Sequence, residues 1–377
     1  MSHAPRSRPP RAWFGGVLAE DLAEVSDDPA VLDRGGWWAV VITFEGRVRL
    51  WRFARRRPAT LPAPHTPWPG LRGAWSTSMD RARYLDGVHE IRRRIREGEV
   101  YQVNLCRLVS CAVPVRDAAA NDPWALATVL AAGNPAPHAG VIDVPASGPL
   151  PATRLVSASP ELFLRRRGEV IASSPIKGTG LTAGDLQPKD TAENIMIVDL
   201  IRNDLQHVCR PGTVEVTGLL EVEHHPGLVH LVSTVQGALA EHAGWPQLLA
   251  ATLPPGSVSG APKSSALRAI ADLEPVARGP YCGAIGWVDA DAGTASLAVG
   301  IRSFWWDGGR IWFGTGAGIT WGSDPDGEWA ETELKAARLV GLASGPADAP
   351  EPVAAGTQPA PGVGAVTRTQ AGHRQRE

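Results

Sequence analysis

Apolar positions along the chain recur in two periods, one typical of helices and one typical of strands. Residues 79–97 carry apolar side chains three or four positions apart, which predicts a helix that Gly98 is placed to end. Further helices are predicted at 190–208, 264–273 and 326–342. Runs rich in β-branched and aromatic residues predict strands, at 100–113, 155–164, 169–172, 281–289, 294–305 and 310–314.

A hairpin is predicted over residues 37–52, where two such runs flank Glu45 and Gly46. Strands and helices are mixed, but regular strand–helix–strand crossovers are missing, which favours an α+β fold over a doubly wound sheet. Core-forming sequence is poor at both ends, so we expect disordered tails at 1–12 and 344–377. Residues 55–73, dense in Pro and Arg, are typical of a linker or loop.

Charge and composition narrow the classes of function. Lys and Arg number 37 against 39 Asp and Glu, a net charge of −2, which argues against a broad nucleic-acid-binding surface. No apolar run approaches the roughly 18 residues of a membrane span, and the basic start lacks the apolar stretch of a secretory signal. We therefore expect a cytoplasmic protein with no membrane or nucleic-acid partner. Its four cysteines lack metal-ligand spacing and are expected to be reduced packing residues.

Two single residues are candidates for catalysis. Lys177 lies in Ser-Pro-Ile-Lys-Gly-Thr-Gly, at the end of a predicted strand. Lysine amines attack electrophilic carbon when their surroundings favour the neutral form. Glu161 follows Ser159 and Pro160, and its carboxyl group is a candidate general acid or base. Each residue also fits an ordinary position, as a solvated loop lysine and an edge-strand glutamate.

Paired acids begin two of the predicted helices: Asp190 with Glu193, and Glu328 with Glu331. A three-residue step puts both carboxylates of a pair on one helix face. Four carboxylates from two helices would make an oxygen-rich site of the kind that suits Mg²⁺. Acids also favour the first turn of any helix, where the macrodipole is positive, so that explanation of each pair stays open.

Two loops of small residues, 256–263 and 314–318, are expected to expose backbone N–H groups that bind carboxylates or phosphates. Neither has the spacing of a nucleotide-binding motif. We therefore expect an anion site, with Ser257 among its residues, and no nucleotide site. Arg302 is a candidate bidentate clamp for a carboxylate, with an ordinary surface arginine as the open alternative.

Nine motifs in order along the chain resemble those of the chorismate-utilising enzymes, a family that includes anthranilate, aminodeoxychorismate, isochorismate and salicylate synthases. They cover roughly residues 80–342. The motifs are YQVNL at 101–105, SASPELF at 157–163, PIKGT at 175–179, ENIMIVDLIRNDL at 193–205, HLVSTVQG at 230–237, GSVSGAPK at 256–263, IRS at 301–303, GTGAGI at 314–319 and SDPDGEWAET at 323–332.

The resemblance implies a fold and a ligand set. The fold is α+β, a large layered antiparallel β-sandwich flanked by helices, in which 13–78 would be a reduced N-terminal strand region and 79–343 the chorismate-binding catalytic domain. The expected ligands are chorismate and Mg²⁺. By resemblance, Glu193 and Glu331 hold the metal, with Asp190 and Glu328 as accompanying acids. The candidate substrate-binding residues are Gly178, Thr179, His230, Ser257, Tyr281, Arg302, Gly316, Ala317 and Gly318.

Lys177 distinguishes the branches of the family. Anthranilate synthases resemble PIAGT at this motif, whereas aminodeoxychorismate synthases have PIKGT, as here. The resemblance implies that the amine attacks ring carbon two of chorismate as the carbon-four hydroxyl leaves, with Glu161 as general acid or base. Ammonia then attacks carbon four and expels the lysine. Gln102 stands where isochorismate and salicylate synthases have a water-activating lysine, which disfavours water as the nucleophile.

These features predict the aminodeoxychorismate-forming branch, which supplies para-aminobenzoate for folate or for a secondary metabolite. Anthranilate synthesis and a non-catalytic chorismate-binding role are the alternatives. The cysteines lack the setting of a glutaminase nucleophile, so the resemblance implies a separate glutamine amidotransferase subunit that supplies ammonia. The short N-terminal region makes a tryptophan-binding pocket doubtful, and the stretch between Lys177 and Glu193 is shorter than in familiar members.

Overall fold

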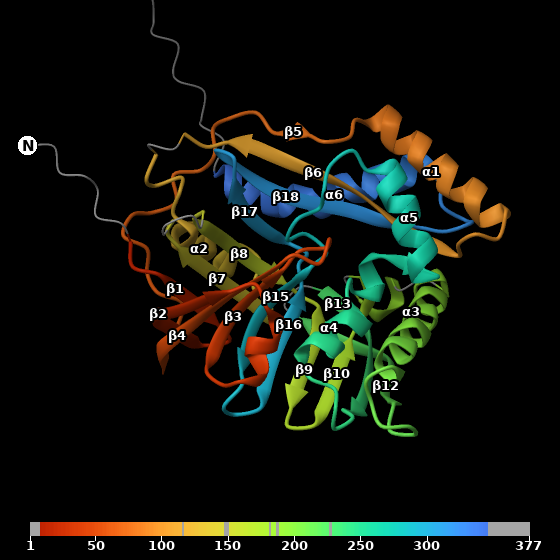
Figure 1. Ribbon diagram of the computed structural model, residues 1–377. Helices are drawn as coiled ribbons and strands as arrows, with labels where there is room; N and C mark the ends of the chain where they lie inside the picture. The colour runs from red at the N-terminus through yellow and green to blue at the C-terminus, as the bar shows by residue number, and fades with distance from the viewer. Residues whose placement is uncertain are drawn as a thin grey trace, which may run out of the picture. The chain divides into compact units, whose positions relative to one another are not determined.

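Antiparallel pairing joins strands from both ends of the chain into one continuous ladder. The computed structural model describes residues 8–114, 117–146, 151–180, 182–185, 188–225 and 228–345 (Figure 1). Most of the two predicted tails falls outside the described residues, which include only 8–12 of the first tail and 344–345 of the second. The N-terminal tail was predicted to extend to residue 12, but strand β1 (Arg11–Phe14) already begins at Arg11. The α+β prediction is confirmed, because the strands pair antiparallel and helices flank them.

In the first half of the ladder, nine described strands pair each with the next. They are β12 (Glu215–His225), β13 (Leu228–Ala238), β10 (Val170–Ser174), β9 (Leu162–Arg167), β16 (Thr294–Val299), β15 (Ala284–Asp289), β3 (Trp37–Ile42), β4 (Val48–Pro58) and β2 (Val17–Ser26). A further strand, β11 (Ile176–Gly180), also pairs with β13.

The second half begins at β1, which pairs with β2 and so continues the ladder. From β1 it proceeds through β7 (His138–Val144), β8 (Thr153–Ser159), β17 (Ser303–Asp307), β18 (Arg310–Ile319) and β6 (Gln102–Ala112). Two short strands, β5 (Ser76–Thr77) and β14 (Gly260–Ala261), also pair with β6. The region predicted as a separate N-terminal strand region therefore shares its sheet with the predicted catalytic domain, through the pairing of β3 with β15.

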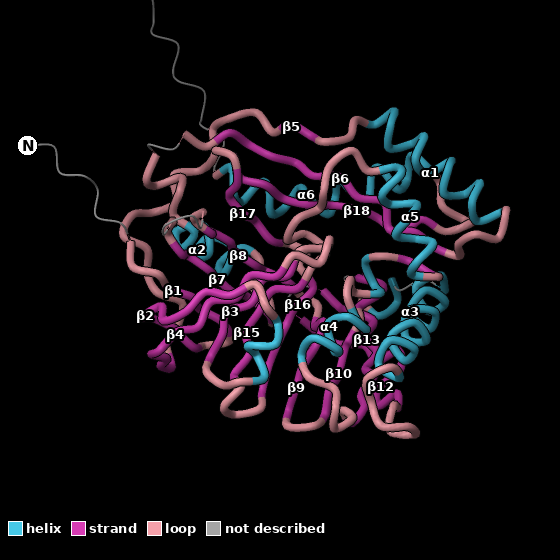
Figure 2. Tube along the Cα trace, in the orientation of Figure 1, coloured by secondary structure: helices cyan, strands magenta, loops and turns pink. Residues whose placement is uncertain are grey.

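Helices cover the two halves separately (Figures 1 and 2). On the second half, α1 (Arg81–Arg96), α2 (Pro123–Gly133), α5 (Lys263–Leu273) and α6 (Pro325–Ser344) pack against β6, β8 and β18. On the first half, α3 (Pro188–Gln206) packs against β13 and against α4 (Trp245–Thr252). Short 3₁₀ turns occur at Pro29–Asp33, Ala183–Asp185 and Gly256–Val258. No helix among the residues that the structure describes has the length and apolarity to cross a membrane.

Two of the predicted strands are each broken in two. The run 155–164 divides into β8 and β9 at Pro160, which cannot donate a ladder hydrogen bond. The run 294–305 divides into β16 and β17, and Arg302 between them has a φ of +53°, outside the extended region. The predicted linker is also partly wrong, since its first residues, 55–58, belong to β4.

Candidate active site

The two breaks lie side by side and form a seam where the chain passes between the halves of the sheet. One crossing contains Glu161 and the other contains Arg302. The backbone N–H of Val299 donates to the carbonyl of Glu161 at 3.0 Å, and that of Ala158 donates to the carbonyl of Arg302 at 3.0 Å. The seam therefore fixes the positions of two candidate residues that are far apart in the sequence.

The carboxyl group of Glu161 is buried at the seam, with 4% of the residue exposed. Burial raises the pKa of this carboxyl from its ordinary value of 4.5 to about 7. A hydrogen bond with the Ser257 side chain and the positive charges of Lys177 and Lys335 act in the opposite direction. Near neutral pH the group can both give and take a proton, which is the property of a general acid or base.

Lys177 lies on an irregular stretch of β11. The strand pairs with β13 at Ile176 and Thr179 but shifts register between them, and Gly178 has a φ of +79°. Irregularities of this kind re-aim the side chains next to them. The Lys177 amine donates to the backbone carbonyl of Ser257 at 3.2 Å, and its side chain is only 14% exposed. This lysine therefore faces the site and is not a solvated loop residue.

The candidate metal glutamates come from the two helix layers. Glu193 is on α3, and its carboxylate lies 3.9 Å from the amine of Lys177. Glu331 is on α6, 2.6 Å from the amine of Lys335. Both lysines act electrostatically on Glu161, and the two acids lie on helices that pack against different halves of the sheet. Glu328 accepts a hydrogen bond of 2.6 Å from Ser323, and the side chain of Asp190 is outside the described part.

Lys335 was not predicted from the sequence as a site residue. Besides its ion pair with Glu331, its amine donates to the carbonyl of Gly316 at 3.1 Å, within the small-residue strand β18. A Glu–Lys pair four residues apart is an ordinary stabilising contact on an exposed helix face, so the spacing gave no signal of function. Only its contact with β18 and its effect on Glu161 place it at the site.

The glycines of β18 face β6 at close range. A Cβ atom at Gly316 would lie 2.5 Å from the sulfur of Cys106, and one at Gly318 would lie 2.3 Å from Nε2 of Gln102. Close packing against β6 therefore leaves no room for a side chain at Gly316 or Gly318. Ala317, between them, is buried in the core. Gln102 is 2% exposed, and its Oε1 has no hydrogen-bond partner in the structure as described.

Three further substrate candidates differ in their setting. Tyr281 is buried in the hydrophobic core next to Cys106, and burial raises the pKa of its hydroxyl. His230 is buried on β13 directly opposite Thr179 of β11, and so lies beside the strand of Lys177. The guanidinium of Arg302 is largely removed from water, which lowers its pKa, and Arg338 lowers it further. Their contacts with a substrate stay predictions.

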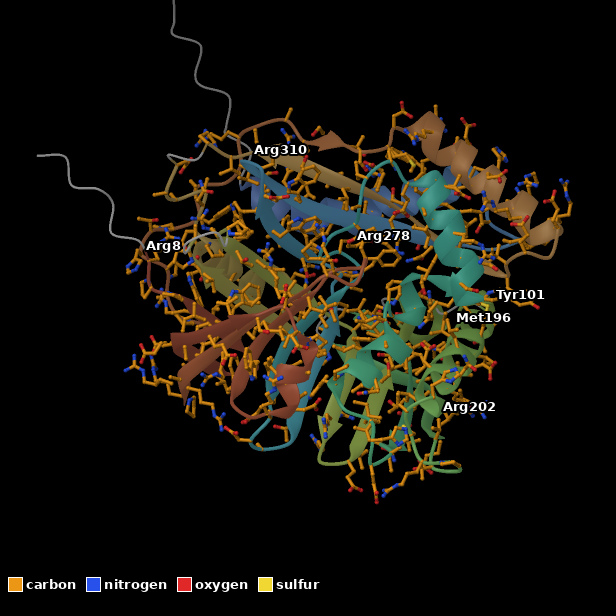
Figure 3. The ribbon with its side chains drawn as sticks, viewed as in Figure 1. Arg8, Tyr101, Met196, Arg202, Arg278 and Arg310 are labelled. Carbon is orange, nitrogen blue, oxygen red and sulfur yellow. The ribbon has the colours of Figure 1, made fainter. Side chains whose placement is uncertain are left out.

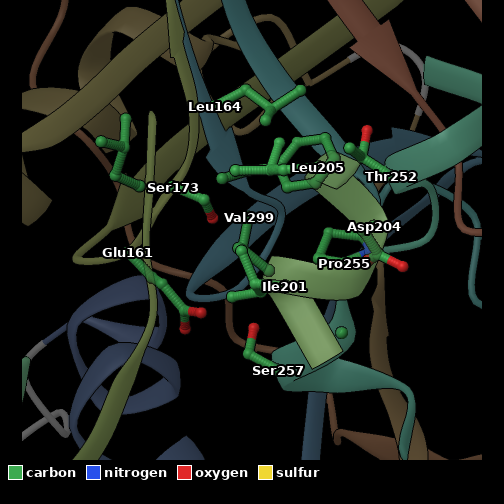
Figure 4. Close-up of a pocket in the computed structure, with 13 residues that line it drawn as sticks. Glu161, Leu164, Ser173, Ile201, Asp204, Leu205, Thr252, Pro255, Ser257 and Val299 are labelled. Atoms are coloured by element: carbon green, nitrogen blue, oxygen red, sulfur yellow. The ribbon is translucent and has the colours of Figure 1, made fainter. Parts of the chain in front are cut away.

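A small cavity opens behind Glu161 (Figure 4). The figure shows the carboxyl of Glu161 and the hydroxyl of Ser257 facing each other on one side, with Asp204 on the other. Burial raises the pKa of Asp204 to about 6, although the amine of Lys263 lies 2.6 Å away. The GSVSGAPK loop and α3 therefore meet in a buried ion pair next to the candidate general acid.

A buried glutamate with a raised pKa, a lysine held beside it and acids from two helices therefore meet in one α+β fold. The chain belongs to the chorismate-binding enzyme family, because the sequence model of that family matches residues 45–341.

Comparison with individual proteins gives relatives of more than one activity. Anthranilate synthase component 1 of Thermus thermophilus is 37% identical over 308 residues, which are 78% of this chain and 64% of that protein. Aminodeoxychorismate synthase component 1 of Klebsiella aerogenes is 34% identical over 321 residues, 80% of this chain and 68% of that protein. The menaquinone-specific isochorismate synthase of Escherichia coli shares the fold, with a TM-score of 0.73 at 21% identity, covering 90% of each chain.

Proposed function

We propose that the chain is the chorismate-converting component of an aminodeoxychorismate synthase, which turns chorismate and ammonia into 4-amino-4-deoxychorismate and water. The observation that carries the proposal is the position of Lys177, held beside Glu193 and the loop of Ser257 and within electrostatic range of Glu161. A nucleophile next to a proton-exchanging acid is the arrangement that covalent substitution requires.

The reaction divides into two displacements. The Lys177 amine forms a C–N bond at ring carbon two while the ring electrons shift and the carbon-four hydroxyl leaves. Glu161 gives its proton to that hydroxyl, which departs as water. Ammonia then bonds to carbon four, the electrons shift back, and the bond between carbon two and Lys177 breaks. The lysine leaves as a free amine, and the surplus proton of ammonia returns to Glu161.

The carboxylates of chorismate need cationic partners. Arg302 is one candidate, because its backbone lies at the seam and its guanidinium is largely removed from water. Lys335 supplies a second cation from α6, beside the strand of Gly316. A guanidinium and an ammonium are the groups that form charge-assisted hydrogen bonds with the two carboxylates of such a substrate.

Mg²⁺ is the proposed cofactor. Within the described residues no three His, Cys, Asp or Glu side chains converge closely enough to hold a metal ion alone. Mg²⁺ is usually bound by one or two carboxylates together with water and substrate oxygens, so Glu193 and Glu331 fit as its protein ligands. When bound, the ion would neutralise carboxylate charge on the substrate.

A separate glutamine amidotransferase is the proposed source of ammonia. All four cysteines are buried and reduced, and burial raises the pKa of Cys106, Cys111 and Cys209. Thiols of this kind are poor nucleophiles, so none of the three is suited to be the nucleophile of a glutaminase. The printed name "component 1" of several relatives fits a two-component enzyme.

A product assay tests the proposal. The chain is incubated with chorismate, Mg²⁺ and ammonium, and the products are separated by liquid chromatography with mass detection. We expect aminodeoxychorismate, and without ammonium a protein mass increased by chorismate less one water. Digestion should place that adduct on Lys177, and Lys177→Ala should lose both adduct and product. Anthranilate as the product would establish the alternative activity that other relatives have, and an inert chain with bound chorismate would establish a non-catalytic role.

A further inference from the structure

Arg107 is a charged side chain buried between the sheet and α6. It lies on β6, and only 4% of it is exposed. Its Nε donates to the hydroxyl of Thr332 at 3.1 Å, and Nη1 donates to the hydroxyl of Thr77 at 3.2 Å. A third contact is an ion pair with Glu333. The guanidinium carbon also lies 4.2 Å from the centre of the Trp329 ring.

Thr332 is held from two sides. While its hydroxyl accepts from Arg107, its backbone carbonyl accepts from the hydroxyl of Thr315 at 2.7 Å. Thr315 is the direct cross-strand partner of Arg107 in the pairing of β18 with β6. Two neighbouring sheet residues thus hold one fully buried helix residue. We call Arg107, Thr315 and Thr332 the clamp.

The clamp lies directly behind the acids of α6. Thr332 follows Glu331 in the sequence, and Trp329, under the guanidinium, follows Glu328. An α-helix has 3.6 residues per turn, so a shift of one residue would rotate α6 by roughly 100° and turn both carboxylates away from their present contacts. Lys335 would move with them, since it is on the same face as Glu331.

The cost of burying a guanidinium indicates a purpose beyond stability. Its acidic partner, Glu333, is 58% exposed, and buried charges of this kind contribute little net stability compared with apolar side chains. What an apolar side chain could not supply is three directed hydrogen-bond contacts from a planar fork. Such contacts fix the angle at which a helix lies on a sheet.

We propose that Arg107 is a positioning residue, which through the clamp sets the orientation of Glu328, Glu331 and Lys335 for the metal and the substrate. This inference rests on the proposed function for the identity of the ligands. The clamp is separate from the contacts of Lys177 and Glu161, none of which involve Arg107.

The test compares matched arginine variants. Arg310, labelled in Figure 3, donates to Ser110 at 2.9 Å and to Ser76 at 2.7 Å. Arg310 therefore connects β18 with β6 and β5, as Arg107 connects β6 with β5, but among the described residues its hydrogen bonds do not reach α6. Arg107→Met, Arg107→Lys, Thr332→Val and the control Arg310→Met are each titrated with Mg²⁺ by calorimetry without chorismate. Steady-state kinetics then give kcat and KM.

Arg107→Met is expected to weaken Mg²⁺ binding about tenfold or more, the usual effect of removing a group that orients a metal ligand. Thr332→Val should weaken it about fivefold, as for one hydrogen bond. Arg107→Lys should be intermediate, and Arg310→Met should stay within about twofold of wild type.

Equal Mg²⁺ affinity in Arg107→Met and Arg310→Met overturns the inference, and so does a wild-type chain that binds no Mg²⁺. If Arg107→Met does not fold, Thr332→Val decides, and an unchanged affinity in that variant has the same meaning. A wild-type chain that binds Mg²⁺ but makes another product overturns the proposed function alone.

Discussion

Glu161→Gln is expected to make the protein more stable in alkaline solution while it removes the general acid. The pKa of the folded carboxyl is about 7, against an ordinary 4.5. Its neutral form is therefore favoured in the fold, and the stability present at low pH is lost as pH rises from about 4.5 through about 7. A tenfold change in proton affinity corresponds to about 1.4 kcal/mol, so the full loss is on the order of 3 kcal/mol.

Glutamine removes this dependence because it keeps the shape of the side chain and never ionises. Relative to wild type, the variant should gain about 3 kcal/mol in the free energy of unfolding at pH 8, but only about 1 kcal/mol at pH 5. Urea unfolding at both pH values measures the two differences, and other titrating groups cancel because they are common to both proteins. A difference that does not change with pH, or a variant less stable than wild type at pH 8, would refute the burial argument.

Turnover supplies a second measurement on the same pair of proteins. The variant should lose about 10²–10⁴-fold in kcat, the usual contribution of general acid–base catalysis. For wild type, kcat/KM should fall as the pH rises above about 7, because the proton that leaves with the hydroxyl is then missing. An active variant with an unchanged pH profile would show that another group protonates the leaving hydroxyl.

Further predictions concern the anion partners and the metal. Arg302→Met should raise KM for chorismate about tenfold or more, as expected when a charge-assisted hydrogen bond is lost, and steady-state kinetics would contradict this if KM were unchanged. Lys335→Met should raise KM as well but leave the Lys177 adduct detectable by mass spectrometry, since the proposal gives Lys335 no covalent bond to substrate; loss of the adduct would give it a larger role. Chelation with EDTA should stop turnover without changing the circular dichroism spectrum, because Glu193 and Glu331 each have a lysine partner in the absence of metal; unfolding on chelation would make the metal structural.

Local pattern predicted α1, α3, α5 and α6 closely but missed α2 and α4. The bounds of α1 and α3 lie within two residues of those predicted, because one face of each helix is buried and its period is visible in the sequence. Strand β1 was missed, since its partners β2 and β7 include one more than a hundred residues away. The breaks at Pro160 and Arg302 were missed for a similar reason: each serves the crossing between the halves of the sheet, which no local window contains.

In the candidate site, too, residues within local motifs could be predicted, whereas residues placed by distant contacts could not. Lys177, Glu161, Glu193 and Glu331 could be named from motifs, and the structure brings both acids to lysines that act on Glu161. Arg107 gave no signal, because a strand arginine is ordinarily a surface residue. Its burial depends on where α6 packs, and that follows from the whole fold.

The distribution of cations gives an independent argument for amine chemistry. Of 37 Lys and Arg residues only four are lysines, which are Lys177, Lys189, Lys263 and Lys335. Three of these lie at the site, beside Glu193, Asp204 and Glu331. Arginine supplies charge elsewhere in the chain, but a guanidinium stays protonated and cannot act as a nucleophile. Lysine at position 177 therefore keeps a possibility of nucleophilic attack that arginine would remove, as the proposed covalent step requires.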